Sequence, residues 1–326
     1  MKKNSSTRIT GIGSALVDLL INESDEFLER LGKKKGGMTL HEDFEIEEIL
    51  QMTSQKPVVV PGGAACNTIV GVGMLGGQAR FIGKRGEDLY GGLYEDQLKN
   101  CNVTPLFDLS QTPTGKVLSV ITPDAQRSMF TCLGASTELE SEKITPDRFQ
   151  DTAIAVIEGY LLFNPELMTA ALKSAKKANA LIALDIASFE VVEAARNILG
   201  DIVNNYVDIL IANEDEAEAY TGFSDESQAI RALSHNVEIA VLKVGKRGSY
   251  IASRGNIIRI EPRNGDEAVD TTGAGDLWAA GFLYGLAHGF SLEKSGEIGS
   301  ACGYEVCQVI GAHIPEQGWE KIRDIL

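Results

Sequence analysis

The chain has 326 residues, of which 44% are hydrophobic and 23% are charged, a composition typical of an ordinary globular protein. Its formal net charge of −16 argues against a nucleic-acid partner and against binding to an anionic membrane. The five cysteines are scattered without a C-x-x-C spacing, which favours a cytoplasmic protein without disulfides. The segment Met1–Thr7 is polar and no run of 18 apolar residues occurs, so we expect no membrane span. We expect the protein to be a monomer or a homodimer.

The first part of the chain predicts strands that do not alternate regularly with helices. Residues 8–21 predict two strands separated by a glycine break, and Val58–Val60 predicts a buried strand before a helix of small residues. Further on, Val117–Ile121 and Arg127–Leu133 alternate like a hairpin. We interpret the hairpin-like strands as a second, small sheet, with strands drawn from about residues 14–40 and 103–135, and we assign the remaining strands to the α/β body.

The second half of the chain alternates between strands and helices. Strands are expected at 154–157, 180–185, 208–212 and 239–244, and helices at 165–178, 189–198, 214–220 and 227–234. Such alternation predicts an α/β fold with a doubly wound, mostly parallel sheet that has helices on both faces. We expect residues 1–326 to form a single unit.

A turn of small residues opens the predicted helix Leu277–Leu286. The first N–H groups of a helix lack intrahelical partners, and the helix dipole makes this end positive. An anion could therefore approach the small residues Gly273, Ala274 and Gly275. A carboxylate beside them, that of Asp276, suits a neutral hydroxyl that must lose a proton, which favours phosphoryl transfer to an alcohol. The alternative is an ordinary helix start, and in either case we expect the helix N-terminus to lower the pKa of Asp276.

Several candidate residues follow predicted strands, where doubly wound folds bind ligands. Asp18 lies in an apolar strand and either accepts two sugar hydroxyls or makes a structural hydrogen bond. Gly62 and Gly63 open a helix and allow either close contact with a substrate or close packing on the sheet. Asn67 can donate and accept hydrogen bonds, as a polyol requires.

Two later segments suit a nucleotide. Asn213 is either a helix N-cap or, with Glu216 three residues on, directed towards a hydrated Mg²⁺ and phosphates. The turn that runs from Lys243 through Gly245 to Gly248 is either a simple hairpin or a bare backbone surface for a nucleotide. The sequence has no P-loop motif, and the G-x-G-x-x-G pattern at 71–76 lies inside a predicted helix, where it cannot form a dinucleotide-binding turn.

Together, these segments resemble the PfkB, or ribokinase-like, carbohydrate kinase family from about Ile9 to Pro315. The two long motifs of the resemblance are Gly62–Gly92 and Asp270–Gly289. It implies a Rossmann-like doubly wound domain with a small β-sheet lid, and the use of ATP and Mg²⁺. It also implies roles for individual residues: Asp276 as catalytic base, Gly273–Gly275 as anion hole, Asp18, Gly63 and Asn67 as substrate contacts, and Asp270 and Thr272 as possible ligands of a monovalent cation such as K⁺.

The segments Lys35–Leu40 and Arg127–Phe130 resemble the adenosine-kinase-like branch of this family. We therefore expect an ATP-dependent kinase acting on a primary hydroxyl of a ribose-like sugar or a nucleoside. The alternatives are a fructokinase- or ribokinase-type sugar kinase, a phosphosugar kinase, and a catalytically silent sugar- or nucleotide-binding regulator. No basic set for a substrate phosphate is evident, and the intact Asp276 and glycine turn argue against the silent protein.

Overall fold

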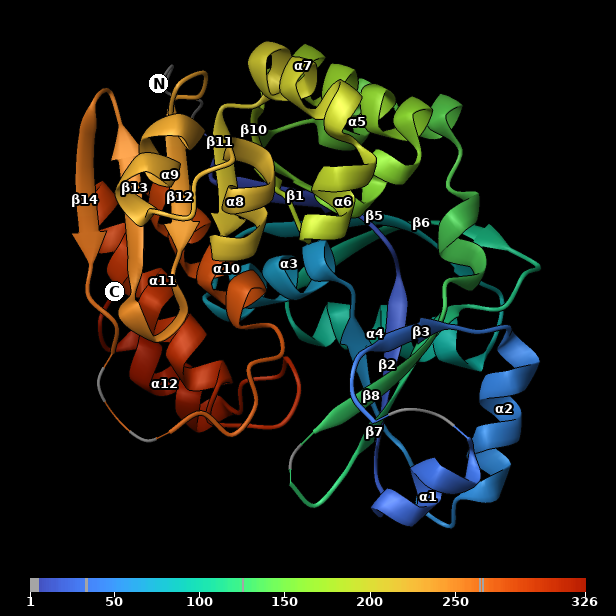
Figure 1. Ribbon diagram of the computed structural model, residues 1–326. Helices are drawn as coiled ribbons and strands as arrows, with labels where there is room; N and C mark the ends of the chain where they lie inside the picture. The colour runs from blue at the N-terminus through green and yellow to red at the C-terminus, as the bar shows by residue number, and fades with distance from the viewer. Residues whose placement is uncertain (1–5, 33–34, 125, 264, 266) are drawn as a thin grey trace.

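Two sheets organise the computed structural model, which describes residues 6–32, 35–124, 126–263, 265 and 267–326 (Figure 1). Residues 1–5 of the polar N-terminal segment lie outside this part. The large sheet has nine strands in the order β14-β13-β12-β11-β10-β9-β1-β5-β6, and the small sheet has five in the order β3-β8-β7-β2-β4. Among the helices in the described ranges, none has the length and apolar character needed to cross a membrane.

The large sheet is parallel from β6 to β12, and only β13 and β14 run antiparallel to their neighbours. Its strands are β1 (Arg8–Ile12), β5 (Ala79–Gly86), β6 (Val103–Ser110), β9 (Thr152–Glu158), β10 (Leu181–Asp185), β11 (Ile209–Asn213), β12 (Ile239–Lys243), β13 (Ser249–Ser253) and β14 (Asn256–Ile260). Later strands add on opposite sides of β1, so the strand order reverses between β1 and β9. This reversal is the position at which doubly wound folds bind ligands.

Helices cover both faces of the large sheet, as the alternating pattern predicts, and a separate apolar core lies under each layer. One layer holds α5 (Pro165–Lys177), α6 (Phe189–Ala194), α7 (Arg196–Tyr206), α8 (Glu214–Thr221) and α9 (Glu226–Leu233). The other holds α3 (Ala64–Met74), α4 (Leu89–Asn100), α10 (Ala274–Ala287), α11 (Leu292–Val306) and α12 (Glu316–Arg323). The helix predicted at 189–198 is in fact two, α6 and α7, separated at Ala195.

Helix α3 packs directly on α10 because small residues line their contact. A Cβ atom added to Gly71 would lie 2.6 Å from the Cβ of Ala280, closer than two carbons can approach. Gly71 and Gly73 of the G-x-G-x-x-G pattern lie inside α3, as predicted, and Gly71 serves helix packing. The close packing brings the N-terminal turns of α3 and α10 together.

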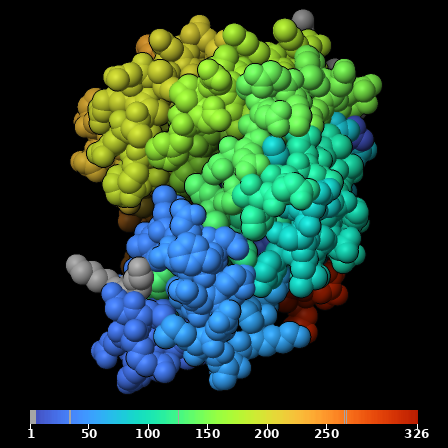
Figure 2. Space-filling model, turned by 90° about the vertical axis from the view of Figure 1, so that its right-hand side faces the viewer, coloured from blue at the N-terminus to red at the C-terminus, as the bar shows by residue number. Residues whose placement is uncertain are grey.

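The small sheet, with α1 (Asp25–Arg30) and α2 (Asp43–Met52), forms what we call the lid, and its N-terminal portion is the blue part at the bottom of Figure 2. Its strands are β2 (Leu16–Asn22), β3 (Met38–Leu40), β4 (Val58–Gly62), β7 (Gly115–Ile121) and β8 (Arg127–Cys132). Two strand assignments differ from the sequence prediction. Residues 103–110 belong to the large sheet, because β5, α4 and β6 form a strand-helix-strand unit, and β4 belongs to the small sheet through antiparallel pairing with β2.

Candidate active site

The turn that opens α10 has the form predicted for an anion-binding helix start. Gly273 is the N-cap and has a φ of 73°, in the left-handed region that favours glycine. A Cβ there would also lie 2.5 Å from the Cβ of Ala312. Ala274 and Gly275 follow as the first helical residues, so their N–H groups lie at the positive end of the helix dipole.

Asp276 lies in the first turn of α10 and is held by α3. The side-chain amide of Asn67 donates a hydrogen bond to its carboxylate at 2.9 Å, and the Thr68 hydroxyl donates to its backbone carbonyl at 3.1 Å. The structure thus brings together the predicted base and a predicted substrate contact, which are far apart in the sequence.

Burial raises the pKa of Asp276 to about 7, although part of the side chain reaches solvent. The hydrogen bond from Asn67 and the charge of Lys243 oppose this rise, while the carboxylates of Asp185 and Glu158 add to it. The expectation that the helix N-terminus lowers this pKa is therefore wrong, because the loss of solvent and the nearby acids outweigh the dipole. A carboxyl that titrates near neutral pH suits general base catalysis.

Lys243 places a positive charge beside the turn. Its ammonium pairs with Asp185 at 2.9 Å, and a Cβ added to Gly275 would lie 3.0 Å from its Nζ. Burial alone would lower the pKa of Lys243, but the carboxylates of Asp185 and Glu216 outweigh burial and raise it. The lysine is therefore charged at neutral pH and lies where a phosphate on the turn would need a cation.

Asn213 and Glu216 form a complete capping box at the start of α8. The Asn213 amide donates to Glu216 at 2.7 Å, and the backbone N–H of each residue donates to the side chain of the other, at 2.8 and 2.9 Å. Burial raises the pKa of Glu216 against the charge of Lys243. The structural alternative, a helix N-cap, is thus present.

The described residues contain no cluster of three or more His, Cys, Asp or Glu side chains arranged to hold a metal. A Mg²⁺ ion that keeps several waters and arrives with the phosphates of a nucleotide needs only one or two protein carboxylates. Glu216 could act on such an ion through water.

The glycine turn after β12 divides into two parts. Gly248 has a structural reason to be glycine, because a Cβ would lie 2.1 Å from the carbonyl oxygen of Ile260. A Cβ on Gly245 would meet only a carboxylate oxygen of Glu214, at 4.0 Å, so this backbone stays open. Both the hairpin and an accessible backbone are therefore present, the latter at Gly245.

Asp18 lies on β2, on the lid, against the end of β4, where Gly62 is the last strand residue and Gly63 the N-cap of α3. A Cβ added to Gly62 would lie 2.5 Å from the Asp18 carboxylate, and one on Gly63, which has a φ of 95°, would lie 2.4 Å from the Ser14 carbonyl oxygen. Burial raises the pKa of Asp18 to about 6, against the charge of Arg127. No hydrogen bond to the Asp18 side chain is found within the described ranges, so its proposed structural hydrogen bond is not observed there.

Glu158 is a site residue that the sequence prediction missed. It ends β9 beside the strand-order reversal, is 2% exposed, and accepts hydrogen bonds from the N–H groups of Ser14 at 2.7 Å and Ala65 at 3.1 Å. It therefore joins the start of α3 to the connection between β1 and β2. Asp185 was missed in the same way, and the signal for both is an acidic residue that ends an apolar strand.

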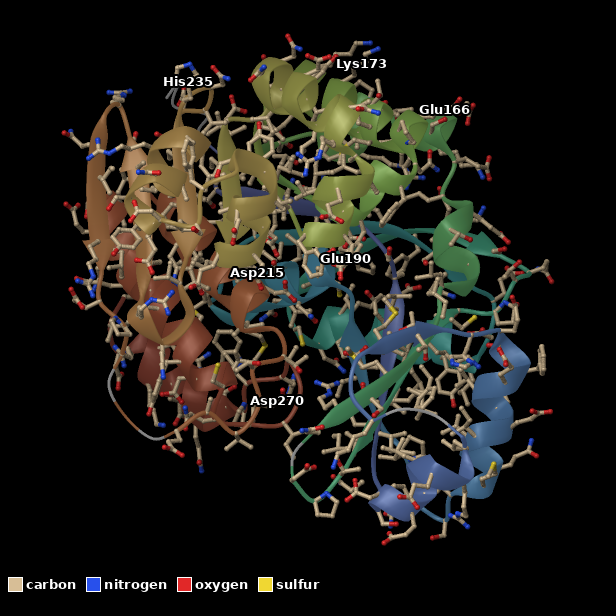
Figure 3. All side chains as sticks on the ribbon, viewed as in Figure 1. Glu166, Lys173, Glu190, Asp215, His235 and Asp270 are labelled. Carbon is tan, nitrogen blue, oxygen red and sulfur yellow. The ribbon has the colours of Figure 1, made fainter. Side chains whose placement is uncertain are left out.

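Asp270 and Thr272 contact a side chain from the lid. Figure 3 labels Asp270 in the loop before α10, beside the end of the β7–β8 hairpin. The guanidinium of Arg127, at the start of β8, donates to the Asp270 carboxylate at 3.1 Å and to the Thr272 hydroxyl. As arranged, these two residues do not fit a monovalent cation, because a fixed positive charge already contacts both.

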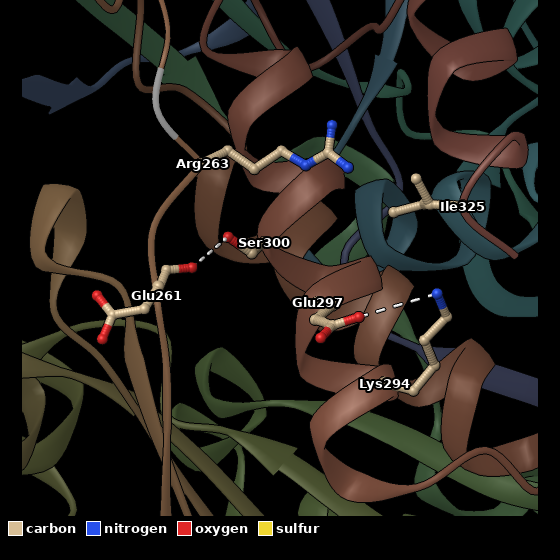
Figure 4. A pocket seen from close by; sticks show the side chains of 6 residues that line it. All are labelled: Glu261, Arg263, Lys294, Glu297, Ser300 and Ile325. Carbon is tan, nitrogen blue, oxygen red and sulfur yellow. Dashed lines mark hydrogen bonds and ion pairs between the residues drawn. The ribbon is translucent and has the colours of Figure 1, made fainter.

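A separate pocket lies between α11, the segment after β14 and the C-terminus (Figure 4). Its lining is of mixed charge and consists of Glu261, Arg263, Lys294, Glu297, Ser300 and Ile325. None of these is a predicted site residue. The convergence of side chains at α10, α3 and the strand ends is therefore the better candidate for the chemistry.

Comparison with known proteins gives one family. The sequence profile described as pfkB family carbohydrate kinase matches residues 17–318. A nucleoside kinase of Methanocaldococcus jannaschii is 28% identical over 265 residues, which cover 80% of this chain and 83% of that protein. Among solved structures, adenosine kinase from Sinorhizobium meliloti has a TM-score of 0.87 at 29% identity and a probable sugar kinase from Rhizobium etli has 0.88 at 28%, each covering 98% of this chain and 99% of the other.

Proposed function

Because the chain belongs to the PfkB family of carbohydrate kinases, we propose that it transfers the γ-phosphoryl group of ATP to the primary hydroxyl of a ribose-like sugar, most favourably that of a nucleoside. One observation carries this proposal. Asp276, a carboxyl with a pKa of about 7, lies in the first turn of α10 with its carboxylate held by Asn67, next to the glycine turn at the helix start and the charged Lys243. A base, an anion site and a cation are what phosphoryl transfer to an alcohol requires.

Each group has a distinct role in the proposed mechanism. Asp276 accepts the proton of the attacking hydroxyl while Asn67 fixes the orientation of its carboxylate. The N–H groups of Gly273 and Gly275 and the ammonium of Lys243 stabilise the negative charge on the transferred phosphoryl group, whereas the N–H of Ala274 donates to the carbonyl of Thr271 at 3.1 Å. Mg²⁺ bound with ATP would neutralise phosphate charge, and Asn213 and Glu216 are the residues that would hold its waters.

The acceptor is proposed from the chemistry of Asp18. A buried carboxylate without a hydrogen-bond donor in the described structure costs free energy unless a ligand supplies one. Two adjacent hydroxyls, such as the 2′ and 3′ hydroxyls of a ribonucleoside, would satisfy both of its oxygens. Two relatives, a nucleoside kinase and an adenosine kinase, support a nucleoside as the acceptor, and the probable sugar kinase from Rhizobium etli keeps a sugar as the second candidate.

A panel of acceptors distinguishes these candidates. We expect ADP release with ATP and Mg²⁺ to depend on an added nucleoside more strongly than on ribose or fructose. Turnover on the free sugars alone would assign a sugar kinase, and tight binding without turnover on any acceptor would assign the silent regulator.

The state of the cysteines supports the proposed cytoplasmic location. All five are free: Cys66, Cys101, Cys132, Cys302 and Cys307.

A double-mutant cycle tests the role of Asp18. Asp18→Ala should reduce kcat/KM strongly on a ribonucleoside, since hydrogen bonds to charged groups contribute ~1.5–3 kcal/mol each. On the 2′-deoxy analogue, one hydrogen bond is already absent, so the same substitution should cost distinctly less. Equal losses on both substrates would remove Asp18 from acceptor binding while leaving the kinase assignment in place.

A further inference from the structure

We infer that the guanidinium of Arg127 replaces a monovalent cation at Asp270 and Thr272, so that the protein needs no K⁺ and carries the required positive charge on its own lid. The part of this inference that concerns catalysis rests on the proposed function, whereas the part that concerns ion binding does not. Members of the family that bind a monovalent cation are expected to do so at the positions that these two residues match.

The contacts of Arg127 span the two sheets. Its Nη1 atom donates to the Asp270 carboxylate at 3.1 Å and to the Thr272 hydroxyl, and its Nη2 atom donates to the Ser119 hydroxyl on β7 at 2.7 Å. The Arg127 and Asp270 side chains are only 9% and 10% exposed. The pair is therefore well shielded from solvent, and screening by salt weakens it little.

No oxygen of Asp270 is left for a cation. One carboxylate oxygen accepts from Arg127 and from the N–H of Gly311 at 2.8 Å, and the other accepts from the N–H and hydroxyl of Thr272 at 3.0 and 2.7 Å. These hydrogen bonds and the charge of Arg127 outweigh burial and lower the pKa of Asp270, so it stays ionised. A K⁺ ion would meet hydrogen-bond donors and a like charge there.

The pair of Arg127 and Asp270 lies next to the anion-binding turn. Thr272 directly precedes Gly273, the N-cap of α10, so the pair holds the segment that presents the first N–H groups of the helix. A bound cation would also hold this segment, but the fraction of protein with the cation bound would depend on the cation concentration in solution. Arg127 supplies the charge from β8, and it therefore also couples the lid to the start of α10.

Thermal melting tests ion replacement without any assay of activity. In KCl and in tetramethylammonium chloride of equal ionic strength, the wild-type melting temperature should be the same. Arg127→Ala should melt lower than wild type in tetramethylammonium and should regain stability in K⁺, because Asp270 is then free to bind the ion. Arg127→Lys, which keeps a charge, should respond less to K⁺ than Arg127→Ala does. Arg259→Ala, which removes a surface arginine paired with Glu261, serves as the matched control and should show no K⁺ response.

Two outcomes would overturn the inference. One is a saturable rise of the wild-type melting temperature with K⁺, and this can be measured even if the Arg127→Ala protein does not fold. The other is a folded Arg127→Ala protein that is indifferent to K⁺. Rates give a second readout: wild-type phosphoryl transfer should be equal in the two salts, whereas Arg127→Ala should lose about tenfold or more in tetramethylammonium, the scale of a lost charged hydrogen bond, and recover in K⁺. If no acceptor is phosphorylated at all, the proposed function fails, and the melting data still decide the question of the ion.

Discussion

The protonation state of Asp276 links the geometry of single residues to the rate of the reaction. Its pKa of about 7 lies above its ordinary value, so the fraction that can accept a proton falls as the pH drops through 7. We expect kcat/KM to decrease roughly tenfold per pH unit below that value. The measurement is a pH–rate profile of the free enzyme, and a flat profile between about pH 5 and 8 would contradict the assignment.

Asn67→Ala should move this acidic limb to higher pH. The hydrogen bond from Asn67 favours the ionised form of Asp276, so its loss raises the pKa further. A structural role for Asn67 alone would lower the rate at every pH without moving the limb. The same profiles therefore separate the two roles.

Glu216→Gln tests the metal-binding prediction. Glutamine keeps one oxygen to accept from the backbone N–H of Asn213 but loses the oxygen that accepts from the Asn213 side chain, so some stability should be lost, while the charge that would attract a hydrated cation is removed. We expect the variant to need more Mg²⁺ for half-maximal rate, with its affinity for the acceptor nearly unchanged. Identical Mg²⁺ titrations for the variant and the wild type would leave Glu216 with the helix start alone.

Single residues could be predicted where a motif or a strand end marks them, and not where pairing between distant strands places them. Asp276 and Asn67 were both predicted, and they are hydrogen-bonded in the structure. Glu158 and Asp185 were not predicted, because their importance depends on the register that places them next to each other in neighbouring parallel strands. The contact of Arg127 with Asp270 joins the lid to the turn before α10, which no local pattern reveals.

At the scale of elements, the contact between α10 and α11 depends on glycine. A Cβ added to Gly281 would lie 2.7 Å from the backbone carbonyl of Ile298 on α11, so Gly281→Ala should destabilise the protein by about 1–3 kcal/mol despite the better helix propensity of alanine. Gly200 on α7 has no neighbouring atom within 4 Å of an added Cβ. Gly200→Ala should therefore stabilise by roughly 0.5–1 kcal/mol.

Denaturant unfolding of both variants checks this pair, since the two changes have the same chemistry and opposite expected signs. Equal effects would show that helix propensity dominates and that the close approach of α10 and α11 relaxes easily. Loss of stability at Gly281 alone would confirm that this contact is tightly packed.

The elements themselves were mostly predictable because apolar runs and helix periodicity are local signals. The alternation after residue 150 gave the parallel sheet and its two helical layers. Residues 103–110 were assigned to the wrong sheet because a strand sequence does not say which edge it joins; only the pairing of β6 with β5 decides this. The break between α6 and α7 at Ala195 has no glycine or proline to mark it.

At the scale of the whole molecule, the lid and the large sheet supply different parts of one proposed site. Asp18 and Arg127 come from the lid, whereas Asp276 and Lys243 belong to a helix and a strand of the α/β body. We therefore expect contacts between the two parts, such as that of Arg127 with Asp270, to affect the rate as well as stability. A motion of the lid would separate the acceptor contacts from the proposed base.

The central claim is that Asp276 activates a primary hydroxyl for phosphoryl transfer. Its most direct test compares wild type with Asp276→Asn, using ATP, Mg²⁺ and the best acceptor of the panel, with the phosphorylated position identified by ³¹P NMR. We predict a phosphomonoester on the primary hydroxyl, no transfer to the 5′-deoxy analogue, and a kcat for Asp276→Asn lower by about 10²–10⁴ with little change in acceptor affinity. An Asp276→Asn protein that keeps most of its turnover, or a product phosphorylated at another position, would contradict the account.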